Sequence, residues 1–218
     1  MELKGFEANE HYGVLRPLRP SDADGMLEWM HDPAVASAFQ VPFETFSRED
    51  ALRFIEGAQK GGASVHLAIT EPATDEYLGT ISLKNVDADA GTAEYAIATR
   101  TCAHGSGIAK TATIDVLRYA FEVLGLNRVY LNVLGTNGRA IHFYEKIGFI
   151  HEGTFRKHVR HEGQLADLEW FAMLSADFRA RESCAAAADS RPHPHDERDD
   201  SRPQPQDEPD AHRQTPKA

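Results

Sequence analysis

The glycine loop His104-Gly105-Ser106-Gly107-Ile108-Ala109 is the stretch that most constrains what this chain can fold into. The apolar run 94–99 precedes it, and beyond it apolar residues recur at helical spacing as far as Leu124. The sequence therefore predicts a strand, a tight loop and a helix that begins near Gly107. Because the first amides of a helix lack partners within it and lie at the positive end of its dipole, we expect main-chain donors for a phosphate group here.

Several kinds of phosphate loop share this pattern. A P-loop would end in Gly-Lys-Ser/Thr, whereas Gly107 is followed by Ile108 and Ala109, which argues against a nucleoside triphosphate. A dinucleotide loop needs an acid at the end of the next strand, and the strand that ends near Asn132 does not match that spacing. On the loop alone, a plain glycine turn before an ordinary helix stays an open alternative.

A second motif favours a functional loop. The segment 137–149, Asn-Gly-Arg-Ala-Ile-His-Phe-Tyr-Glu-Lys-Ile-Gly-Phe, resembles the second CoA-side motif of the GNAT N-acetyltransferases, and the loop 104–109 resembles their acyl-CoA pyrophosphate loop. Gly107 and Ala109 match that loop, while His104 stands where Arg or Gln is usual. The resemblance covers roughly residues 12–176. Within the family it is closest to the branch of ribosomal-protein alanine and nucleotide-aminosugar acetyltransferases.

The resemblance implies a fold of the α/β (α+β) class. The GNAT fold is a single mixed, mostly antiparallel sheet of about seven strands, with a V-shaped splay between strands 4 and 5 and about four flanking helices. The residue patterns agree with it. They predict strands at 13–20, 64–70, 77–86, 92–99, 128–133, 149–156 and 166–174, and helices that begin near Ser21, Ser47, Gly107 and Thr136.

Three segments divide the chain. We expect residues 1–11 to form a flexible arm and residues 12–178 to form the acyltransferase domain. Residues 183–218 are rich in Pro, Asp and His and carry almost nothing apolar, so they cannot offset the entropy lost on ordering, and we predict a disordered tail. The spacing of His193, His195 and Asp196 fits no closed metal site, and we predict no metal.

Charge and composition limit the partners and the compartment. The net charge of −11 argues against a nucleic-acid surface and suits a cationic substrate. Two cysteines, no apolar run long enough to span a membrane and no signal-peptide core predict a cytoplasmic protein without a membrane partner. A homodimer is left open.

The resemblance assigns acetyl-CoA as cofactor, with CoA as the product, and places it residue by residue. The loop amides would hold the pyrophosphate, and the pantetheine arm would pair like a strand with residues 95–99. The amide of Ala96 or Ile97 would stabilise the developing oxyanion. The residues assigned to the cofactor are Ala96, Ile97, Ala98, Thr99, His104, Gly105, Ser106, Gly107, Ile108, Ala109, Asn132, Asn137, Ile141 and Tyr144.

Two residues carry the expected proton transfers. Tyr144 aligns with the tyrosine that protonates the departing thiolate in many family members, and Glu94 would accept the proton of the amine. The alternatives are a core aromatic residue at Tyr144 and a solvent-facing strand residue at Glu94. His66, His31 and Glu169 are further candidate bases, and some family members use no side-chain base at all. The residues assigned to the acceptor are Trp29, His31, Phe39, Glu94 and Glu169.

The predicted function is an acetyl-CoA-dependent N-acetyltransferase that acts on a primary amine of a small molecule by direct attack in a ternary complex. Residues 27–33 resemble the aminosugar-modifying members, so the first choice of acceptor is an aminosugar, often nucleotide-linked. A protein N-terminal amine, an aminoglycoside-like antibiotic and a polyamine stay open. Outside this class, His104 favours a non-catalytic acyl-CoA-binding module, and the acidic tail favours a scaffold that recruits a partner.

Overall fold

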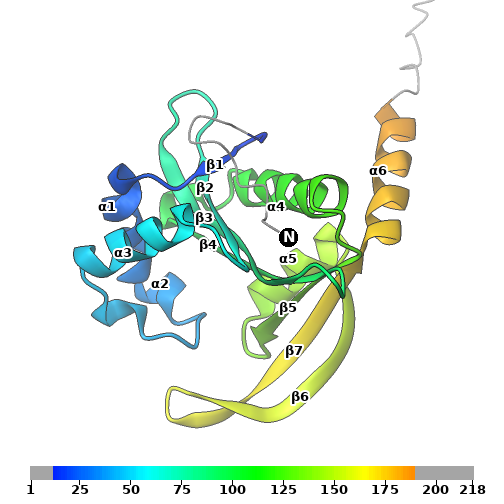
Figure 1. Cartoon of the computed structure of the whole chain (residues 1–218). Coiled ribbons are helices and arrows are strands. Elements are labelled where there is room, and N and C mark those ends of the chain that lie inside the picture. Colours follow the sequence, from blue (N-terminus) through cyan, green and yellow to red (C-terminus); the bar gives the residue numbers. More distant parts are fainter. Residues whose placement is uncertain (1–11, 190–218) are drawn as a thin grey trace, which may run out of the picture.

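The structure is a computed structural model that describes residues 12–189. A seven-stranded sheet forms its centre (Figure 1). The strand order is β1-β2-β3-β4-β5-β7-β6, and β4 and β5 form the parallel pair in an otherwise antiparallel sheet. The predicted arm 1–11 and residues 190–218 of the predicted tail lie outside the described residues. The strands are β1 Leu15–Pro17, β2 Val65–Thr70, β3 Tyr77–Asp87, β4 Thr92–Thr99, β5 Arg128–Leu134, β6 Ile150–His161 and β7 Gln164–Leu174.

Helices cover the two faces of the sheet in separate groups (Figure 1). Apolar side chains of α1 and α3 form one core with Ala68 and Ala98, whereas α4 and α5 share the other core with Tyr95 and Leu131. This division follows from the alternation of side chains along each strand. The helices are α1 Ala23–Met30, α2 Pro33–Ala36, α3 Arg48–Gln59, α4 Ile108–Arg118 with a π turn at Tyr119–Val123, α5 Gly138–Ile147 and α6 Ser175–Asp189.

The centre of the sheet splays open, as predicted. β4 pairs with β5 only where Thr92–Glu94 face Arg128–Tyr130. Its other neighbour, β3, stays paired with it as far as Thr99. Beyond Glu94, therefore, the β5-facing edge of β4 has no ladder partner, which leaves main-chain donors and acceptors available at the mouth of the splay.

The C-terminal part departs most from the prediction. The two predicted strands with a charged turn between them form one long hairpin that turns at Glu162 and Gly163, and it bends away from the sheet (Figure 1). β6 is an edge strand that is exposed on both faces. Charged residues therefore occur on both of its faces, and its sequence lacks the alternation of apolar and polar residues that predicts a strand. A bulge between Phe155 and Val159, where Lys157 adopts a φ of 51°, breaks the alternation further.

Residue 183 was wrong as the predicted start of the disordered tail, and the structure contains two helices that were not predicted. Residues 183–189 belong to α6, and α2 is a short helix within the predicted irregular segment. The ring of Phe178 packs on Phe121 at 5.4 Å between centroids, and Arg118 pairs with Glu182 at 2.5 Å. These contacts hold a helix whose alanine-rich sequence has a high intrinsic propensity but no regular apolar stripe. In the described part of the chain, no helix has both the length and the apolar character that crossing a bilayer requires.

Candidate active site

The glycine loop forms a cradle of main-chain donors at the start of α4. Gly105 and Gly107 have φ values of 81° and 87°, a region that favours glycine, and open space lies in front of both. The Ser106 hydroxyl donates to the Ala103 carbonyl at 2.8 Å and accepts from the Ile108 amide at 3.2 Å, so it shapes the loop. Within residues 12–189, no acceptor bonds the amides of Gly105, Gly107 and Ala109. Such a set of donors fits the pyrophosphate of CoA.

Arg139 brings a guanidinium to this cradle, and sequence reasoning missed its role. Its Nη1 donates to Nδ1 of His104 across 3.3 Å, from the first turn of α5. Partial burial and the charge of Arg139 lower the pKa of His104, against the opposing effect of Asp32. His104 is therefore neutral near pH 7, and the positive charge beside the loop belongs to Arg139. The pair Gly138-Arg139, directly after the capping Asn137, was the signal for it.

The start and end of α5 match the predicted motif. Asn137 caps the helix, its Oδ1 accepting from the Ala140 amide at 3.1 Å, and Gly148 ends it with a φ of 108°. The side-chain amide nitrogen of Asn137 makes no bond within the described residues, which agrees with the predicted double role of cap and cofactor contact. Ile141 packs against the core of α4 and α5.

Tyr144 lies beneath the splay. Its ring contacts Tyr95 of β4 at 6.0 Å and Phe171 of β7 at 6.3 Å, so it reaches residues on both sides of the opening. Only 8% of the residue is exposed, and burial raises the pKa of the phenol to about 12. The raised pKa keeps the phenol protonated near pH 7, and no described residue hydrogen-bonds its hydroxyl. Tyr144 is a core aromatic residue, and its predicted role as a proton donor stays a prediction.

Glu94 stands at the last rung before the splay, on the face that α1 and α3 cover further along the sheet. It lies opposite Tyr130 of β5. Its Oε1 accepts from Lys84 at 2.7 Å and its Oε2 from Asn85 at 3.0 Å. These two donors fix the orientation of the carboxylate. The Glu94 side chain is 18% exposed, and its predicted role as the base stays a prediction.

The side chain of His66 lies on the same face of the sheet as that of Glu94. His66 of β2 pairs with Ser82 of β3, which in turn pairs with Ala96 of β4. Its Nδ1 lies 2.8 Å from the Ser82 hydroxyl, and the ring of Phe54 packs against it at 4.8 Å. Burial and then Lys84 lower the pKa of His66, so it is a neutral imidazole near pH 7. This imidazole therefore lies two strands away from the predicted position of the thioester on β4, with Ser82 of β3 between them.

Three of the five predicted acceptor residues make contacts in and around the segment that joins α1 to α3. Trp29 is only 4% exposed, and its indole nitrogen donates to Tyr77 at 2.9 Å. Phe39 packs on Trp29 and on Phe43, and His31 bonds the carbonyl of Phe46 at 2.8 Å. Their role toward the acceptor stays a prediction.

Glu169, another predicted acceptor residue, lies on the other face of the sheet. It pairs with Val133, whose side chain belongs to the core of α4 and α5. Its Oε2 accepts from His151 at 2.6 Å and from Thr154 at 2.7 Å. Glu169 therefore stands on the side of Tyr144 and is separated from Glu94 by the sheet.

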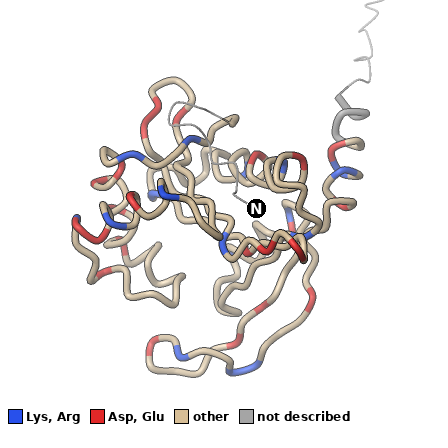
Figure 2. The backbone as a smooth tube through the Cα atoms, in the orientation of Figure 1, with Lys and Arg blue, Asp and Glu red and all other residues tan. Residues whose placement is uncertain are grey.

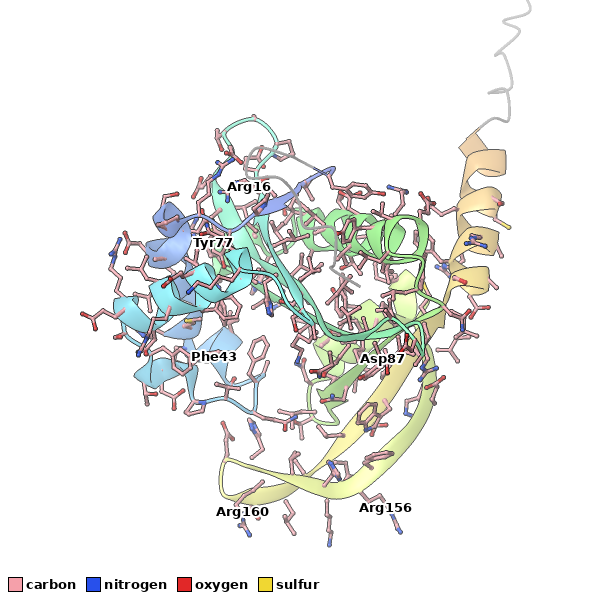
Figure 3. All side chains as sticks on the ribbon, viewed as in Figure 1. Arg16, Phe43, Tyr77, Asp87, Arg156 and Arg160 are labelled. Carbon is pink, nitrogen blue, oxygen red and sulfur yellow. The ribbon has the colours of Figure 1, made fainter. Side chains whose placement is uncertain are left out.

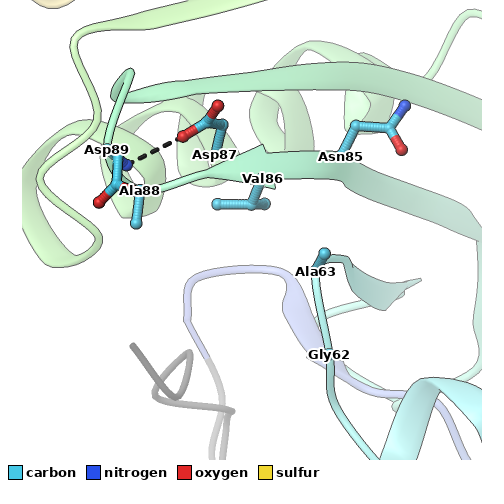
Figure 4. A pocket seen from close by; sticks show the side chains of 7 residues that line it. All are labelled: Gly62, Ala63, Asn85, Val86, Asp87, Ala88 and Asp89. Atoms are coloured by element: carbon cyan, nitrogen blue, oxygen red, sulfur yellow. Dashed lines mark hydrogen bonds between the residues drawn. The ribbon is translucent and has the colours of Figure 1, made fainter.

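An open hollow of about 510 Å³ lies apart from these residues, at the β3–β4 turn (Figure 4). Residues 62–63 and 85–89 line it. The Asp87 carboxylate already accepts from the amides of Asp89 and Ala90 at 2.9 Å each. Among residues 12–189, no three His, Cys, Asp or Glu side chains gather in a way that could hold a metal ion. Lys and Arg on the one hand and Asp and Glu on the other are both spread over the described backbone (Figure 2).

Comparisons with known proteins agree with this geometry. The family model for the acetyltransferase (GNAT) domain matches residues 14–150. The probable N-acetyltransferase YjcK of Bacillus subtilis is 30% identical over 176 residues, which cover 75% of this chain and 94% of that protein. The spermidine N(1)-acetyltransferase of Vibrio cholerae is 27% identical over 143 residues, 66% of this chain and 81% of that protein.

A solved structure shows the same fold. The spermidine N-acetyltransferase of Vibrio cholerae in complex with CoA and spermine superposes with a TM-score of 0.69 at 23% identity, over 76% of this chain and 96% of that one. With the family match, this establishes the class. The chain belongs to the GNAT family and is an acetyl-CoA-dependent N-acetyltransferase.

Proposed function

We propose that this enzyme acetylates a primary amine of a small molecule, with an aminosugar, free or nucleotide-linked, as the first choice of acceptor. The observation that carries the proposal is that the loop amides, the open edge of β4 and Tyr144 meet around one splay. These are the three elements that acyl transfer from a thioester requires: an anchor for the donor, main-chain donors for the oxyanion and an acid for the leaving group.

When bound, acetyl-CoA supplies the acetyl group as a thioester. The amides of Gly105, Gly107 and Ala109, with Arg139, would hold its diphosphate. The open edge of β4 would orient the arm, so that the amide of Ala96 or Ile97 faces the charge that develops on the carbonyl oxygen. Pairing of the arm with β4 would hold the thioester carbon in line with the amine. The acetyl group would then pass directly to the amine, without a covalent enzyme intermediate.

Proton transfers would occur on opposite faces of the sheet. Glu94, on the face of α1 and α3, would accept the proton of the incoming ammonium. Tyr144, on the face of α4 and α5, would donate its proton to the departing sulfur. The deprotonated amine would then attack the thioester carbon from one face, and the thiolate would leave toward the other and take the Tyr144 proton. The nitrogen would lose its second proton to solvent as the C–S bond breaks, and the Tyr144 phenolate would regain a proton from solvent.

A polyamine is the second candidate acceptor, because a relative and a similar structure carry the name spermidine N-acetyltransferase. A peptide amine has support from the putative ribosomal N-acetyltransferase YdaF of Bacillus subtilis, 33% identical over 100 residues. Against the non-catalytic module stands the contact of Arg139 with His104, through which Arg139 would supply the charge that a neutral His104 lacks.

The test is release of free CoA thiol from acetyl-CoA in the presence of hexosamines, nucleotide-linked hexosamines, spermidine and a peptide, with calorimetric titration of CoA in parallel. We expect CoA to bind and thiol release to depend on a hexosamine. Binding of CoA without release for any amine would support the non-catalytic module, and a complete lack of CoA binding would refute the proposal.

A further inference from the structure

A short turn, Thr101–Ala103, leads from the end of β4 into the glycine loop. The His104 amide donates to the Thr101 carbonyl at 3.0 Å, and the Ser106 hydroxyl donates to the Ala103 carbonyl at 2.8 Å. These hydrogen bonds hold the turn and the loop in one arrangement. A ligand that binds the loop amides in this arrangement therefore stabilises the turn as well.

Side chains at the start of this turn bind α1 and α2. The Thr101 hydroxyl donates to the Asp32 carboxylate, which also caps α2 by accepting from the Ala34 amide at 2.9 Å. Arg100, the residue before the turn, donates from its Nε to Glu28 of α1 at 2.6 Å. Both contacts are charge-assisted hydrogen bonds, which are the stronger kind. The backbone that enters the donor loop is thus tied to α1 and to the start of α2.

The segment 32–46, which runs from α2 toward α3, has few polar attachments. Among the described residues, Thr101 is the one outside 31–46 that hydrogen-bonds it. Aromatic packing supplies the rest, and Phe43, which meets Trp29 at 5.1 Å between ring centroids, lies among the helices on this side of the sheet (Figure 3). Residues 40–42 are exposed. A segment held in this way opens at low cost in free energy, so the loss or gain of one bond changes its order.

Asp32 also lies close to the donor cradle. Burial and the charge of Arg139 lower the pKa of His104, and the charge of Asp32 opposes them. One carboxylate therefore acts on the cap of α2, on the turn and on a residue of the glycine loop.

We propose that the Thr101–Asp32 hydrogen bond couples donor binding to the order of the segment 32–46, so that CoA bound at the loop orders this segment. The proposal rests on the proposed function, because it requires CoA at the loop. Thr101 and Asp32 are positioning residues that act through the turn. Since linkage is reciprocal, an ordered segment also strengthens CoA binding. The segment carries Phe39, a predicted acceptor residue, so an acceptor would meet it in its ordered form once the donor has bound.

The experiment measures amide hydrogen exchange of the full chain by mass spectrometry, with and without saturating CoA. CoA should slow exchange at the glycine loop in every variant. In the unaltered protein we expect it to slow exchange in 34–46 as well, by about threefold or more. Thr101→Val keeps the shape of the side chain and removes the hydroxyl, so the slowing in 34–46 should fall below about 1.5-fold and Kd for CoA should rise about twofold to threefold in calorimetry.

Thr45→Val is the matched control. The Thr45 hydroxyl donates to the Pro42 carbonyl at 2.9 Å, so this variant removes a bond inside the segment and leaves the Thr101–Asp32 bond in place. Exchange in 34–46 should be faster overall in Thr45→Val, and CoA should still slow it.

Two results would overturn the coupling and leave the proposed function intact. One is slower exchange at the loop with no change in 34–46 of the unaltered protein. The other is an equal loss of the CoA response in Thr101→Val and Thr45→Val, which would assign the response to general loosening of the segment. A failure of the unaltered protein to bind CoA in calorimetry would refute the proposed function and the coupling together.

Discussion

The donor side and the acceptor side of the splay are built in different ways. On the donor side, backbone amides of one loop and the helix that follows it form the cradle, within a single stretch of chain. On the acceptor side, side chains from β4, β5, β6 and β7 come together through long-range strand pairing. The first arrangement depends on local conformation and the second on register, so substitutions should affect them differently.

The largest expected effect is at the donor loop. Gly107→Val forces a β-branched residue into a φ of 87° and displaces the amides at the start of α4. We expect kcat/KM for acetyl-CoA to fall by about three orders of magnitude, since two or more hydrogen bonds to a charged group are lost. Gly163→Val is the control in initial-rate assays, because Gly163 has a similar φ of 76°, open space around it and a position at the hairpin tip.

Tyr144→Phe should have the next largest effect. Removal of the general acid should lower kcat by about 100-fold with little change in KM for either substrate. Tyr95→Phe is the matched variant, because the Tyr95 hydroxyl bonds Thr113 at 2.8 Å in the same core. It should cost about 1 kcal/mol of unfolding free energy and leave kcat within about twofold. Equal kcat values for Tyr144→Phe and the unaltered enzyme would assign Tyr144 to packing alone.

A smaller loss is expected at the proposed base. Glu94→Gln keeps the shape of the side chain and removes its ability to take a proton, so kcat should fall about 30-fold at pH 7. His66→Asn should change kcat by less than about threefold if Glu94 is the base. A reversed order, together with an acidic limb in the pH–rate profile that disappears in His66→Asn, would assign the proton to the Ser82–His66 pair.

The smallest effect concerns the charge beside the loop. Arg139→Gln should weaken CoA binding about tenfold, with the difference shrinking at high salt. Because the pKa of His104 lies below 6.5, its ring gains charge as the pH falls below neutrality, and it gains it more readily without Arg139. Calorimetry from pH 7.5 to 5.5 should show CoA affinity falling less with pH in the unaltered protein than in His104→Gln. Identical profiles would remove His104 from the site.

The sequence predicted the conformation of the glycine loop and the ends of α5 well, because their signals are local. Positive φ at Gly105 and Gly107, the cap at Asn137 and the stop at Gly148 each follow from residue type within a few positions. The contribution of Arg139 escaped prediction because it depends on a contact across 35 residues with His104. Motif spacing showed that the two segments meet, but it did not show which side chains touch.

Side-chain directions far from the loop were predicted less well, because residue type does not tell which way a side chain faces. Trp29 lies on α1 and is buried, with Phe39 packed against it from the segment that follows. Tyr130 and Trp170 lie on alternating strands, and only the β5–β7 register brings their rings together. Phe155 meets Trp170 across the irregular β6–β7 ladder, which no pattern in the sequence marks.

The most direct measurement of the central claim is a crystal structure of the protein with CoA bound. We predict that diphosphate oxygens lie within hydrogen-bonding distance of the amides of Gly105, Gly107 and Ala109, that the arm runs along the open edge of β4, and that the sulfur lies beside the Tyr144 hydroxyl. A diphosphate bound elsewhere, or a β4 edge that closes onto β5 with CoA outside the splay, would contradict the account.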